Sequence, residues 1–420
     1  MIEEQDHPGF EGLGLSADLL RTVQEEGYAQ PTPIQAEAIP LILAGRDLLA
    51  AAQTGTGKTA AFVLPILERL RHHANTSFSP ARHAVRVLIL APTRELAMQV
   101  DQMSRTYGRT IALRSTVVYG GVPIEPQIKA LQTGVEILVA TPGRLLDHVG
   151  QRTVNLSQVE ILVLDEADRM LDMGFIPDVR KIVALLPARR QNLLFSATFS
   201  SEVRRLAKEF LQDPVTVEVA ARNATATNVE HVLYPVDRDR KEELLVHLIR
   251  RDQMKQVLVF TRTKIAASRL ASYLDRRGVP AVAIHSDRSQ PDRTRALEEF
   301  KRGDLTVLVA TDVASRGLDI EELPYVVNFE LPFEPQDYIH RIGRTGRANA
   351  SGVAISFATV DEVELLRGVQ RLLRKAIPYQ VVEGFVPDRN VEPRPISSRP
   401  AHHHRPHPKT IRRAGAPSRR

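Results

Sequence analysis

The stretch Ile161-Leu162-Val163-Leu164-Asp165-Glu166-Ala167-Asp168 passes directly from four apolar residues to a tetrad with three carboxylates. An unbroken apolar run of this kind is typical of a strand buried on both faces of a parallel sheet. Ligands bind beside the carboxyl ends of such strands. Because a buried carboxylate is costly unless a metal or a reaction uses it, the tetrad predicts a functional site. The alternative is an exposed acidic turn, which leaves the apolar run before it unexplained.

A second segment, Ala52-Gln53-Thr54-Gly55-Thr56-Gly57-Lys58-Thr59, has the spacing of a phosphate-binding loop. The sequence predicts a strand at Leu48–Ala51 before it and a helix that opens at Lys58. The backbone amides of such a loop and the start of the helix can bind phosphate oxygens. Ala52 stands where the general motif has glycine. The expected nucleotide contacts are Thr54, Gly55, Thr56, Gly57, Lys58 and Thr59.

The loop and the tetrad together indicate hydrolysis of a nucleoside triphosphate. We expect Lys58 to reach the β- and γ-phosphates, and Thr59 and Asp165 to hold magnesium. Glu166 is then the candidate to orient or deprotonate the attacking water. Thr32 and Pro33 predict a helix start that presents the amide of Gln35. That amide could read an adenine edge, or Gln35 could be a surface residue.

Composition limits the class of protein. A chain of 420 residues is long enough for two or three domains, and it has no cysteine, which excludes disulfides and thiolate metal sites. The N-terminal residues contain no apolar signal segment, and no apolar run is long enough to span a membrane. We therefore expect a cytoplasmic protein that does not bind membranes.

The net charge of +6 lies at the C-terminal end. Residues 381–420 hold nine Arg or Lys and three Asp or Glu, so the first 380 residues carry 47 charges of each sign and sum to zero. Seven prolines and little apolar periodicity predict a disordered basic tail. The tail is either a nucleic-acid-binding arm or a solvated segment that keeps the protein in solution. His402-His403-His404 lacks further ligands, so we expect no metal site there.

Short apolar runs alternate with helical patterns along most of the chain, which predicts parallel α/β sheets. A break in the pattern near residues 220–228 predicts a linker between two domains. The expected strands after the first are Val87–Leu90, Ile137–Ala140, Ile161–Leu164, Asn192–Phe195, Val257–Phe260, Ala281–Ile284, Val307–Ala310 and Tyr325–Asn328. The second half has no phosphate loop, so one nucleotide site is expected.

The second half supplies positive charge in Tyr338-Ile339-His340-Arg341-Ile342-Gly343-Arg344-Thr345-Gly346-Arg347. Arg344 and Arg347 are three residues apart and could share one helical face. Guanidinium groups on a γ-phosphate can accelerate hydrolysis by about 10³ to 10⁵. The alternatives are a solvated basic helix and a contact with a phosphate backbone.

In order and spacing, these motifs resemble those of DEAD-box ATP-dependent RNA helicases, over roughly residues 10–379. The residues between Asp165 and Phe175 look most like the bacterial RhlE-like group. Further motifs that carry the resemblance are Pro92-Thr93-Arg94-Glu95-Leu96, Gly120-Gly121, Thr141-Pro142-Gly143-Arg144, Ser196-Ala197-Thr198 and Ala310-Thr311-Asp312-Val313-Ala314-Ser315-Arg316-Gly317-Leu318-Asp319. Ser315 and Ser286 differ from the residues that are most common at these positions of the family. Both are small, so we expect the protein to remain active.

The resemblance implies an α/β fold of two tandem RecA-like parallel-sheet domains, at residues 1–220 and 229–380, joined by a short linker at 221–228 and followed by the tail. It implies ATP and Mg²⁺ as cofactors and RNA as partner. It places Phe10, Gln35 and Asp319 on the nucleotide. The implied catalytic set is Lys58, Asp165, Glu166, His340, Arg344 and Arg347. The residues that would couple the nucleotide and RNA sites are Asp168, Ser196 and Thr198, with His340.

The same resemblance implies an RNA-binding set that is rich in Thr, Gly and Arg, which are suited to phosphate and sugar rather than to bases. It implies unwinding of short duplexes without sequence preference, by a core expected to be monomeric, with ribosomal or RNA-decay proteins as candidate partners. A DNA-directed translocase and a non-catalytic ATP-gated clamp are the alternatives. The RNA set is Pro92, Thr93, Arg94, Gly121, Thr141, Pro142, Arg144, Arg262, Gln290, Arg293, Thr311, Asp312 and Arg316.

Overall fold

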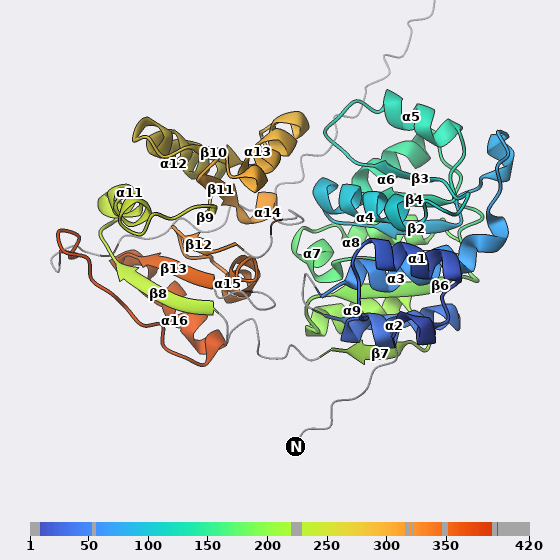
Figure 1. Ribbon diagram of the computed structural model, residues 1–420, viewed down its shortest axis with the longest axis horizontal. Coiled ribbons are helices and arrows are strands. Elements are labelled where there is room, and N and C mark those ends of the chain that lie inside the picture. The colour runs from blue at the N-terminus through green and yellow to red at the C-terminus, as the bar shows by residue number, and fades with distance from the viewer. Residues whose placement is uncertain are drawn as a thin grey trace, which may run out of the picture.

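Two parallel sheets organise the chain, and each is built from the apolar runs of one half of the sequence (Figure 1). In the computed structural model, the described residues are 9–52, 56–219, 229–315, 320, 323–346, 352–388 and 393. We call the part with the first sheet domain 1 and the part with the second sheet domain 2. The expected linker at 221–228 lies outside the described residues.

Domain 1 contains a seven-stranded sheet in the order β3-β4-β2-β5-β6-β1-β7, with parallel pairing throughout its described strands. Its strands are β1 (Leu48–Ala51), β2 (Val87–Leu90), β3 (Ser115–Val118), β4 (Ile137–Ala140), β5 (Ile161–Leu164), β6 (Gln191–Ser196) and β7 (Val215–Glu218). Its α-helices are α1 (Ala17–Glu25), α2 (Pro33–Leu43), α3 (Lys58–Leu70), α4 (Arg94–Tyr107), α5 (Glu125–Gln132), α6 (Pro142–Gly150), α7 (Ala167–Asp172), α8 (Ile176–Val183) and α9 (Ser201–Phe210). Short 3₁₀ helices are η1 (Phe10–Leu13), η2 (Arg71–His73) and η3 (Pro80–Arg82).

Domain 2 contains a six-stranded sheet in the order β10-β11-β9-β12-β13-β8, again parallel. Its strands are β8 (Val229–Pro235), β9 (Val257–Thr261), β10 (Ala281–Ile284), β11 (Val307–Thr311), β12 (Tyr325–Asn328) and β13 (Gly352–Ala358). Its helices are η4 (Arg238–Arg240), α11 (Lys241–Arg251), α12 (Lys264–Arg276), α13 (Gln290–Arg302), α14 (Asp312–Ser315), α15 (Pro335–Ile342), η5 (Val360–Glu362) and α16 (Val363–Leu373).

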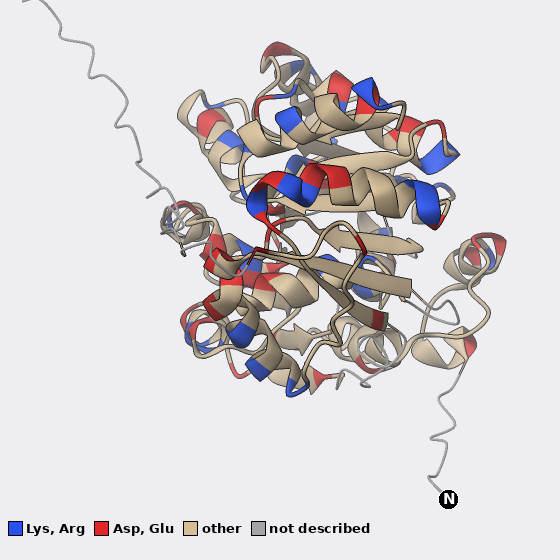
Figure 2. Cartoon of the chain, turned by 90° about the vertical axis from the view of Figure 1, so that its left-hand side faces the viewer, with Lys and Arg blue, Asp and Glu red and all other residues tan. Residues whose placement is uncertain are grey.

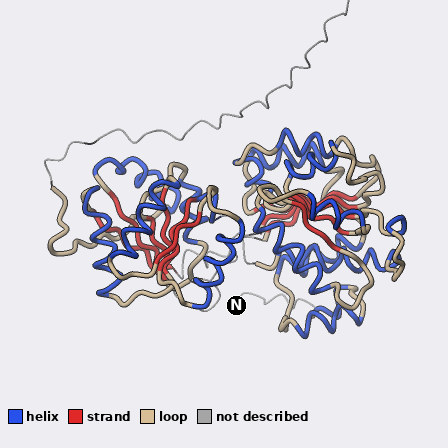
Figure 3. Tube along the Cα trace, turned by 90° about the horizontal axis from the view of Figure 1, so that it is seen from above, coloured by secondary structure: helices blue, strands red, loops and turns tan. Residues whose placement is uncertain are grey.

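Helices cover both faces of each sheet, which is why the strands read as continuous apolar runs (Figure 3). In β5, Ile161 and Val163 lie in the core beneath α1 to α4, whereas Leu162 and Leu164 lie in the core beneath α5 to α9. In domain 2, α11 and α12 cover one face and α13, α15 and α16 the other. The two-domain parallel α/β prediction is therefore confirmed.

Every strand that the sequence predicted is present, within about a residue at each end. The strands that it did not single out are β3, β7, β8 and β13. Three of these lie at sheet edges, where one side is uncovered and the apolar signal is weaker, and β13 begins with a glycine and contains a serine. Among the described residues, no helix is long and apolar enough to cross a membrane.

The start of the predicted tail packs against domain 2. Val382 and Phe385 join the core beneath α11, and the Phe385 ring lies 5.5 Å from the His247 ring and 4.8 Å from the Arg240 guanidinium carbon. These side chains bury apolar surface that a fully solvated tail would leave in water. Residues 389–392 and 394–420, which hold all the cations of the tail, lie outside the described residues.

Candidate active site

The carboxyl edge of the domain 1 sheet gathers the predicted nucleotide motifs. Strands β5, β6 and β1 are neighbours and run parallel, so the segments that follow them leave the sheet side by side. The phosphate loop follows β1, the carboxylate tetrad follows β5, and the Ser196-Ala197-Thr198 motif closes β6. Motifs separated by more than a hundred residues in sequence thus meet at one edge.

Gly57 joins the phosphate loop to α3. It caps the helix in the left-handed region (φ +85°), and a Cβ at this position would overlap the side-chain amide of Gln35. Glycine therefore meets both a conformational and a steric requirement here. Lys58 is buried and its Nζ donates to the Ala52 carbonyl at 2.5 Å, so the side chain lies back over the loop. Thr54 and Gly55 lie outside the described residues.

Gln35 lies beneath this loop and is completely buried, so the alternative of a surface residue is wrong. Its Oε1 accepts from the Thr32 amide at 2.9 Å, and its Nε2 donates to the Gly57 carbonyl at 3.2 Å. The side chain ties the start of α2 to the loop. Phe10 is also buried, with its ring 6.5 Å from that of Tyr28 in an edge-on arrangement. Contacts of Gln35 and Phe10 with a base stay predictions.

Asp165 and Glu166 put two carboxylates into a buried position. Burial raises the pKa of Asp165 to about 7, the neighbouring charge of Glu166 adds to the rise, and Lys58 opposes it. Asp165 Oδ1 accepts from the Glu166 amide at 2.9 Å. Glu166 adopts the left-handed conformation (φ +54°), and its Oε2 is buried with no hydrogen-bond partner among the described residues. Two buried carboxylates, one with a raised pKa and one with an unpartnered oxygen, favour binding of a cation or a polarised water.

Asp168 faces β6 rather than the open side of the tetrad. Its Oδ2 accepts from the Ala197 amide at 3.1 Å and from the Thr198 hydroxyl at 3.3 Å. The Thr198 amide in turn donates to Ser196 Oγ at 3.3 Å. The structure thus brings the three residues of the predicted coupling set into one hydrogen-bonded group. Their role in coupling stays a prediction.

The other half of the domain 1 edge, at the ends of β2, β3 and β4, gathers the predicted RNA residues. Thr93 caps α4, Thr141 and Pro142 open α6, and the Arg94 guanidinium lies against Gly121, where a side chain would collide with it. Gly121 also adopts the left-handed conformation (φ +76°). Like Gly57, it therefore meets both a conformational and a steric requirement for glycine.

Arg144 lies in α6 at the same edge. Its Nη2 donates to the Val122 carbonyl at 2.9 Å. Its Nε and Nη1 atoms are buried without a hydrogen-bond partner in the described part of the chain, although Nε lies 3.5 Å from Asp147 Oδ2 in an ion pair. A guanidinium whose donors are not all hydrogen-bonded is suited to an anionic ligand such as phosphate.

Glu95 contacts domain 2 and was not assigned a role from the sequence. Its Oε1 lies 2.7 Å from Arg293 Nη2 and accepts from Gln290 Nε2 at 3.2 Å, and all three side chains are buried. Gln290 and Arg293 were predicted to hold RNA, and here they also join the domains. Glu95 stands out in the sequence as a carboxylate in the quoted Pro92–Leu96 motif. Its contact with Arg293 could not be predicted, because that residue lies 198 positions further along the chain.

Arg169, directly after the tetrad, makes a second contact between the domains. Its Nη1 lies 3.4 Å from Asp337 Oδ1 on α15, and the two side chains are 7% and 16% exposed. The predicted arginine motif therefore starts on a helix that touches the tetrad segment. His340 is half-buried and Arg344 is buried. Asp319, Arg316 and Arg347 lie outside the described residues.

Arg341 belongs to the arginine motif but is built into the core of domain 2. Its guanidinium pairs with both oxygens of Asp312, at 2.6 and 2.8 Å, and donates to the Glu330 carbonyl at 2.7 Å. Asp312, predicted to contact RNA, therefore holds this arginine in a two-pronged ion pair. Thr311 precedes it at the end of β11 and is buried.

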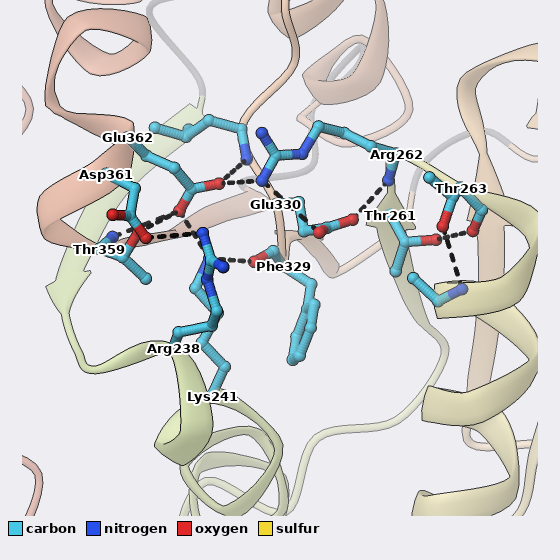
Figure 4. A network of polar contacts seen from close by, with 12 residues as sticks. Arg238, Lys241, Thr261, Arg262, Thr263, Phe329, Glu330, Thr359, Asp361 and Glu362 are labelled. Atoms are coloured by element: carbon cyan, nitrogen blue, oxygen red, sulfur yellow. Dashed lines mark hydrogen bonds and ion pairs between the residues drawn. The ribbon is translucent and has the colours of Figure 1, made fainter. Parts of the chain in front are cut away.

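Arg262, also predicted to contact RNA, lies in a buried ionic network at the ends of β9, β12 and β13 (Figure 4). Its Nη2 lies 2.9 Å from Glu362 and 3.5 Å from Glu330. Glu362 also accepts from Lys241 Nζ at 2.6 Å. Burial lowers the pKa of Lys241, and the Glu362 charge opposes this. The network occupies the edge of domain 2 that corresponds to the nucleotide edge of domain 1.

Comparison with known proteins agrees with this geometry. Residues 32–206 match the DEAD/DEAH box helicase family and residues 240–349 match the helicase conserved C-terminal domain. The DEAD-box ATP-dependent RNA helicase CshA of Geobacillus kaustophilus is 43% identical over 366 residues, 87% of this chain and 77% of that protein. The ATP-dependent RNA helicase DBP2 of Eremothecium gossypii is 43% identical over 380 residues, 89% of this chain and 68% of that protein.

A solved structure supports the same relation. Saccharomyces cerevisiae Dbp5 bound to RNA and ADP BeF3 superposes with a TM-score of 0.78 at 32% identity, covering 89% of this chain and 95% of that one. The narrower likeness to the RhlE-like group stays a prediction. From the matched family models, the extent of the sequence identity and the shared two-domain architecture, the chain belongs to the DEAD-box ATP-dependent RNA helicase family.

Proposed function

We propose that this protein hydrolyses ATP when its two domains close on RNA, and that closure locally separates short RNA duplexes. The observation that carries this is the pair of contacts between the domains, Glu95 with Arg293 and Arg169 with Asp337. Both lie at the carboxyl edge of domain 1, one beside the predicted RNA residues and one beside the tetrad. An enzyme that couples two ligands through closure needs contacts of this kind between its sites.

The likeness to Dbp5 supports this arrangement of domains. The TM-score is 0.78 for Dbp5 bound to RNA and ADP BeF3, and 0.60 for a Dbp5 variant bound to Nup159, Gle1, IP6 and ADP. The sequence identities are 32% and 30%, so divergence of sequence does not account for the difference. A third Dbp5 structure, bound to Gle1 and IP6, has a TM-score of 0.70 at 31% identity, so the overall likeness is greatest to the RNA-bound structure among these three, which supports the proposal.

The nucleotide edge fits ATP with magnesium. Asp165 and Thr59 offer the hard oxygen ligands that magnesium prefers, and Glu166, next to Asp165 in sequence, has a buried Oε2 without a hydrogen-bond partner among the described residues. A magnesium ion held there would neutralise charge on the phosphates. Lys58 binds the β- and γ-phosphates. Its bond to the Ala52 carbonyl is the contact that a phosphate would replace.

Glu166 orients and deprotonates the attacking water, since it is the carboxylate with a free buried oxygen. Domain 2 supplies charge from the end of α15 and the loop that follows it. Arg344 and Arg347 stabilise the γ-phosphate only after closure, so hydrolysis depends on the RNA that favours closure, and His340 helps to couple the nucleotide site to the RNA site. Gln35, Phe10 and Asp319 position the base and ribose. Asp168, Ser196 and Thr198 transmit the state of the tetrad to β6.

RNA binds along the two carboxyl edges through phosphate and sugar. Thr, Gly and Arg at strand ends and helix starts do not read base edges, so binding is independent of sequence. Contacts with 2′-hydroxyls separate RNA from DNA. The core acts as a monomer, and ribosomal or RNA-decay proteins are the partner classes expected. The RNA-binding set is Pro92, Thr93, Arg94, Gly121, Thr141, Pro142, Arg144, Arg262, Gln290, Arg293, Thr311, Asp312 and Arg316.

The test is phosphate release over many turnovers with RNA, with DNA of the same sequence, and with neither. We expect RNA to stimulate release and DNA to leave it near the basal rate. Arg293→Gln should abolish most of the stimulation, whereas Arg295→Gln, an exposed arginine on the same helix, should not. Equal stimulation by DNA would support the translocase alternative. A single turnover without release would support the clamp.

A further inference from the structure

The C-terminal end of α16 forms an open groove of about 610 Å³ that the proposed function does not use. The groove lies on domain 2, and its lining is dominated by basic side chains. They are Arg367, Arg371, Arg374 and Lys375, with Glu364 as the acidic member and Gln370 between them. Arg367 and Arg371 are four residues apart and share one face of the helix, and Arg374 follows the last helical residue.

The positive charge of the groove is largely unpaired. Arg367 is held by Glu364 one turn earlier. Arg371 donates only to the Arg367 carbonyl, and within the described residues Arg371, Arg374 and Lys375 have no carboxylate partner. Figure 2, which views the molecule from the domain 2 side, shows both acidic and basic segments along the helices of that side.

Stabilisation of the helix does not account for this concentration of charge. Cations in the last turn interact with the helix dipole by about 0.3 to 1 kcal/mol, an effect confined to that turn. Arg367 lies more than one turn earlier, and like charges three and four residues apart repel one another. Arg374 also takes the left-handed conformation (φ +51°) that favours glycine.

The backbone that carries the groove is anchored to its neighbours in domain 2. Gly368 brings α16 close to α15, where an added Cβ would lie 3.1 Å from the Pro335 ring. After the helix, the chain is bound to β8, because the Leu233 amide donates to the Pro378 carbonyl and the Gln380 amide to the Leu233 carbonyl, each at 2.8 Å. The backbone positions of the cations are therefore fixed before an anion binds, which lowers the cost of binding.

We propose that the α16 groove is a second RNA contact, which binds backbone phosphates of RNA that extends beyond the interdomain site. This rests on the proposed function. Guanidinium groups match phosphate oxygens in a two-pronged geometry, and the groove lining contains no large apolar side chain among the described residues, since Leu372, Tyr379 and Val381 are exposed but do not line it. An RNA backbone therefore fits the groove better than an amphipathic protein segment.

The topology makes the proposal specific about RNA length. Strand β8, to which the groove is attached, is the opposite edge strand from β10 and lies three places from β9, whose end carries Arg262, the nearest strand end of domain 2 in the RNA-binding set. With strands about 4.8 Å apart, this is about 14 Å across the sheet. An RNA that only fills the interdomain site does not reach the groove, whereas a longer RNA does.

The experiment measures binding of two RNAs to the full chain with a non-hydrolysable ATP analogue. One is a single strand of about 10 nucleotides, and the other carries a hairpin arm at one end. The test variant is Arg371→Gln, Arg374→Gln and Lys375→Gln together. The matched control is Lys255→Gln, Arg276→Gln and Arg277→Gln, three exposed cations near α12 at the other edge of the sheet.

We expect the groove variant to lose about 10-fold or more in affinity for the hairpin RNA, and to flatten its salt dependence by about 2 to 3 in log–log slope. The groove variant should match wild type in its affinity for the short strand and in the ATPase activity that this strand stimulates. The control variant should match wild type in both of these properties. Failure of the short strand to stimulate wild type would instead count against the proposed function.

The proposal is overturned if the groove variant binds the hairpin RNA as wild type does, or if it loses affinity equally for both RNAs. It is also overturned if polyglutamate, used as an acidic polypeptide probe, binds the groove and the RNAs are unaffected. That result would identify a protein-docking site. An Arg371→Lys, Arg374→Lys variant, which keeps the charge, should recover most of the hairpin affinity.

Discussion

The two domains have the same parallel architecture, but the buried charges at their carboxyl edges are paired to different extents. In domain 1, Asp165 and Glu166 lie side by side, and one oxygen of Glu166 has no partner among the described residues. In domain 2, the corresponding edge holds Glu362 between Lys241 and Arg262. We propose that the incompletely paired edge takes a cation and a reacting water, whereas the paired edge serves as a structural frame.

The largest effect is expected for the substitution Glu166→Gln, which tests the domain 1 side of this comparison. The amide keeps the shape of the side chain but cannot take a proton from water, so we expect turnover to fall by about 10² to 10⁴ while ATP and RNA still bind. Phosphate release and equilibrium binding measure the two properties separately. Glu37→Gln, an exposed glutamate on α2, is the control. Turnover near the wild-type rate would remove Glu166 from the mechanism.

In domain 2 the equivalent substitution should act on stability instead. Glu362→Gln leaves Lys241 and Arg262 without their shared carboxylate, which should cost about 3 to 5 kcal/mol in the free energy of unfolding. Urea denaturation followed by circular dichroism measures it. Glu364→Gln, exposed and two residues away, should change stability by less than about 0.5 kcal/mol. A similarly small effect of Glu362→Gln would mean that the network is not a frame.

A third prediction concerns pH in the metal-free protein. Because the pKa of Asp165 is raised from 3.8 to about 7, the folded state holds a proton that the unfolded state releases. The free energy of unfolding should therefore fall as pH rises from about 4 to 7, by at most about 4 kcal/mol, and level off above that. Thermal melts in a chelator should show this decline, and Asp165→Asn should flatten it. An unchanged decline in the variant would assign it to other groups.

The smallest effect is expected from the tail, which belongs to neither edge. Truncation after Asp388 retains the packing of Phe385 but removes all nine cations of the tail. If the tail is a nucleic-acid-binding arm, RNA affinity should fall about tenfold at low salt and the salt slope should flatten. Filter binding over a range of salt concentrations measures both. An unchanged slope would favour the alternative of a solvated segment.

Local patterns were sufficient to predict most of the fold. The buried strands β1, β2, β4 and β5 were evident because both of their faces are covered and every residue is apolar, and β6 was evident from its apolar centre, Leu193 to Phe195. The edge strands β3 and β7 were not, because half or more of their residues are incompletely buried. The helix starts at Thr32 and Lys58 followed from the chemistry of capping and of the phosphate loop. These strands and helix starts depend on residues that are close together in the chain, so they can be predicted from the sequence.

Contacts between distant segments could not be predicted in the same way. The phosphate loop, the tetrad and the predicted ligand roles came from local motifs. The partners of Glu95, Arg169 and Asp312 did not, since each lies on another element or another domain. The sequence by itself determined which residues carry the nucleotide chemistry. Only the tertiary structure decided which charges stay open for ligands and which are neutralised, because pairing depends on which strand ends and helices the fold brings together.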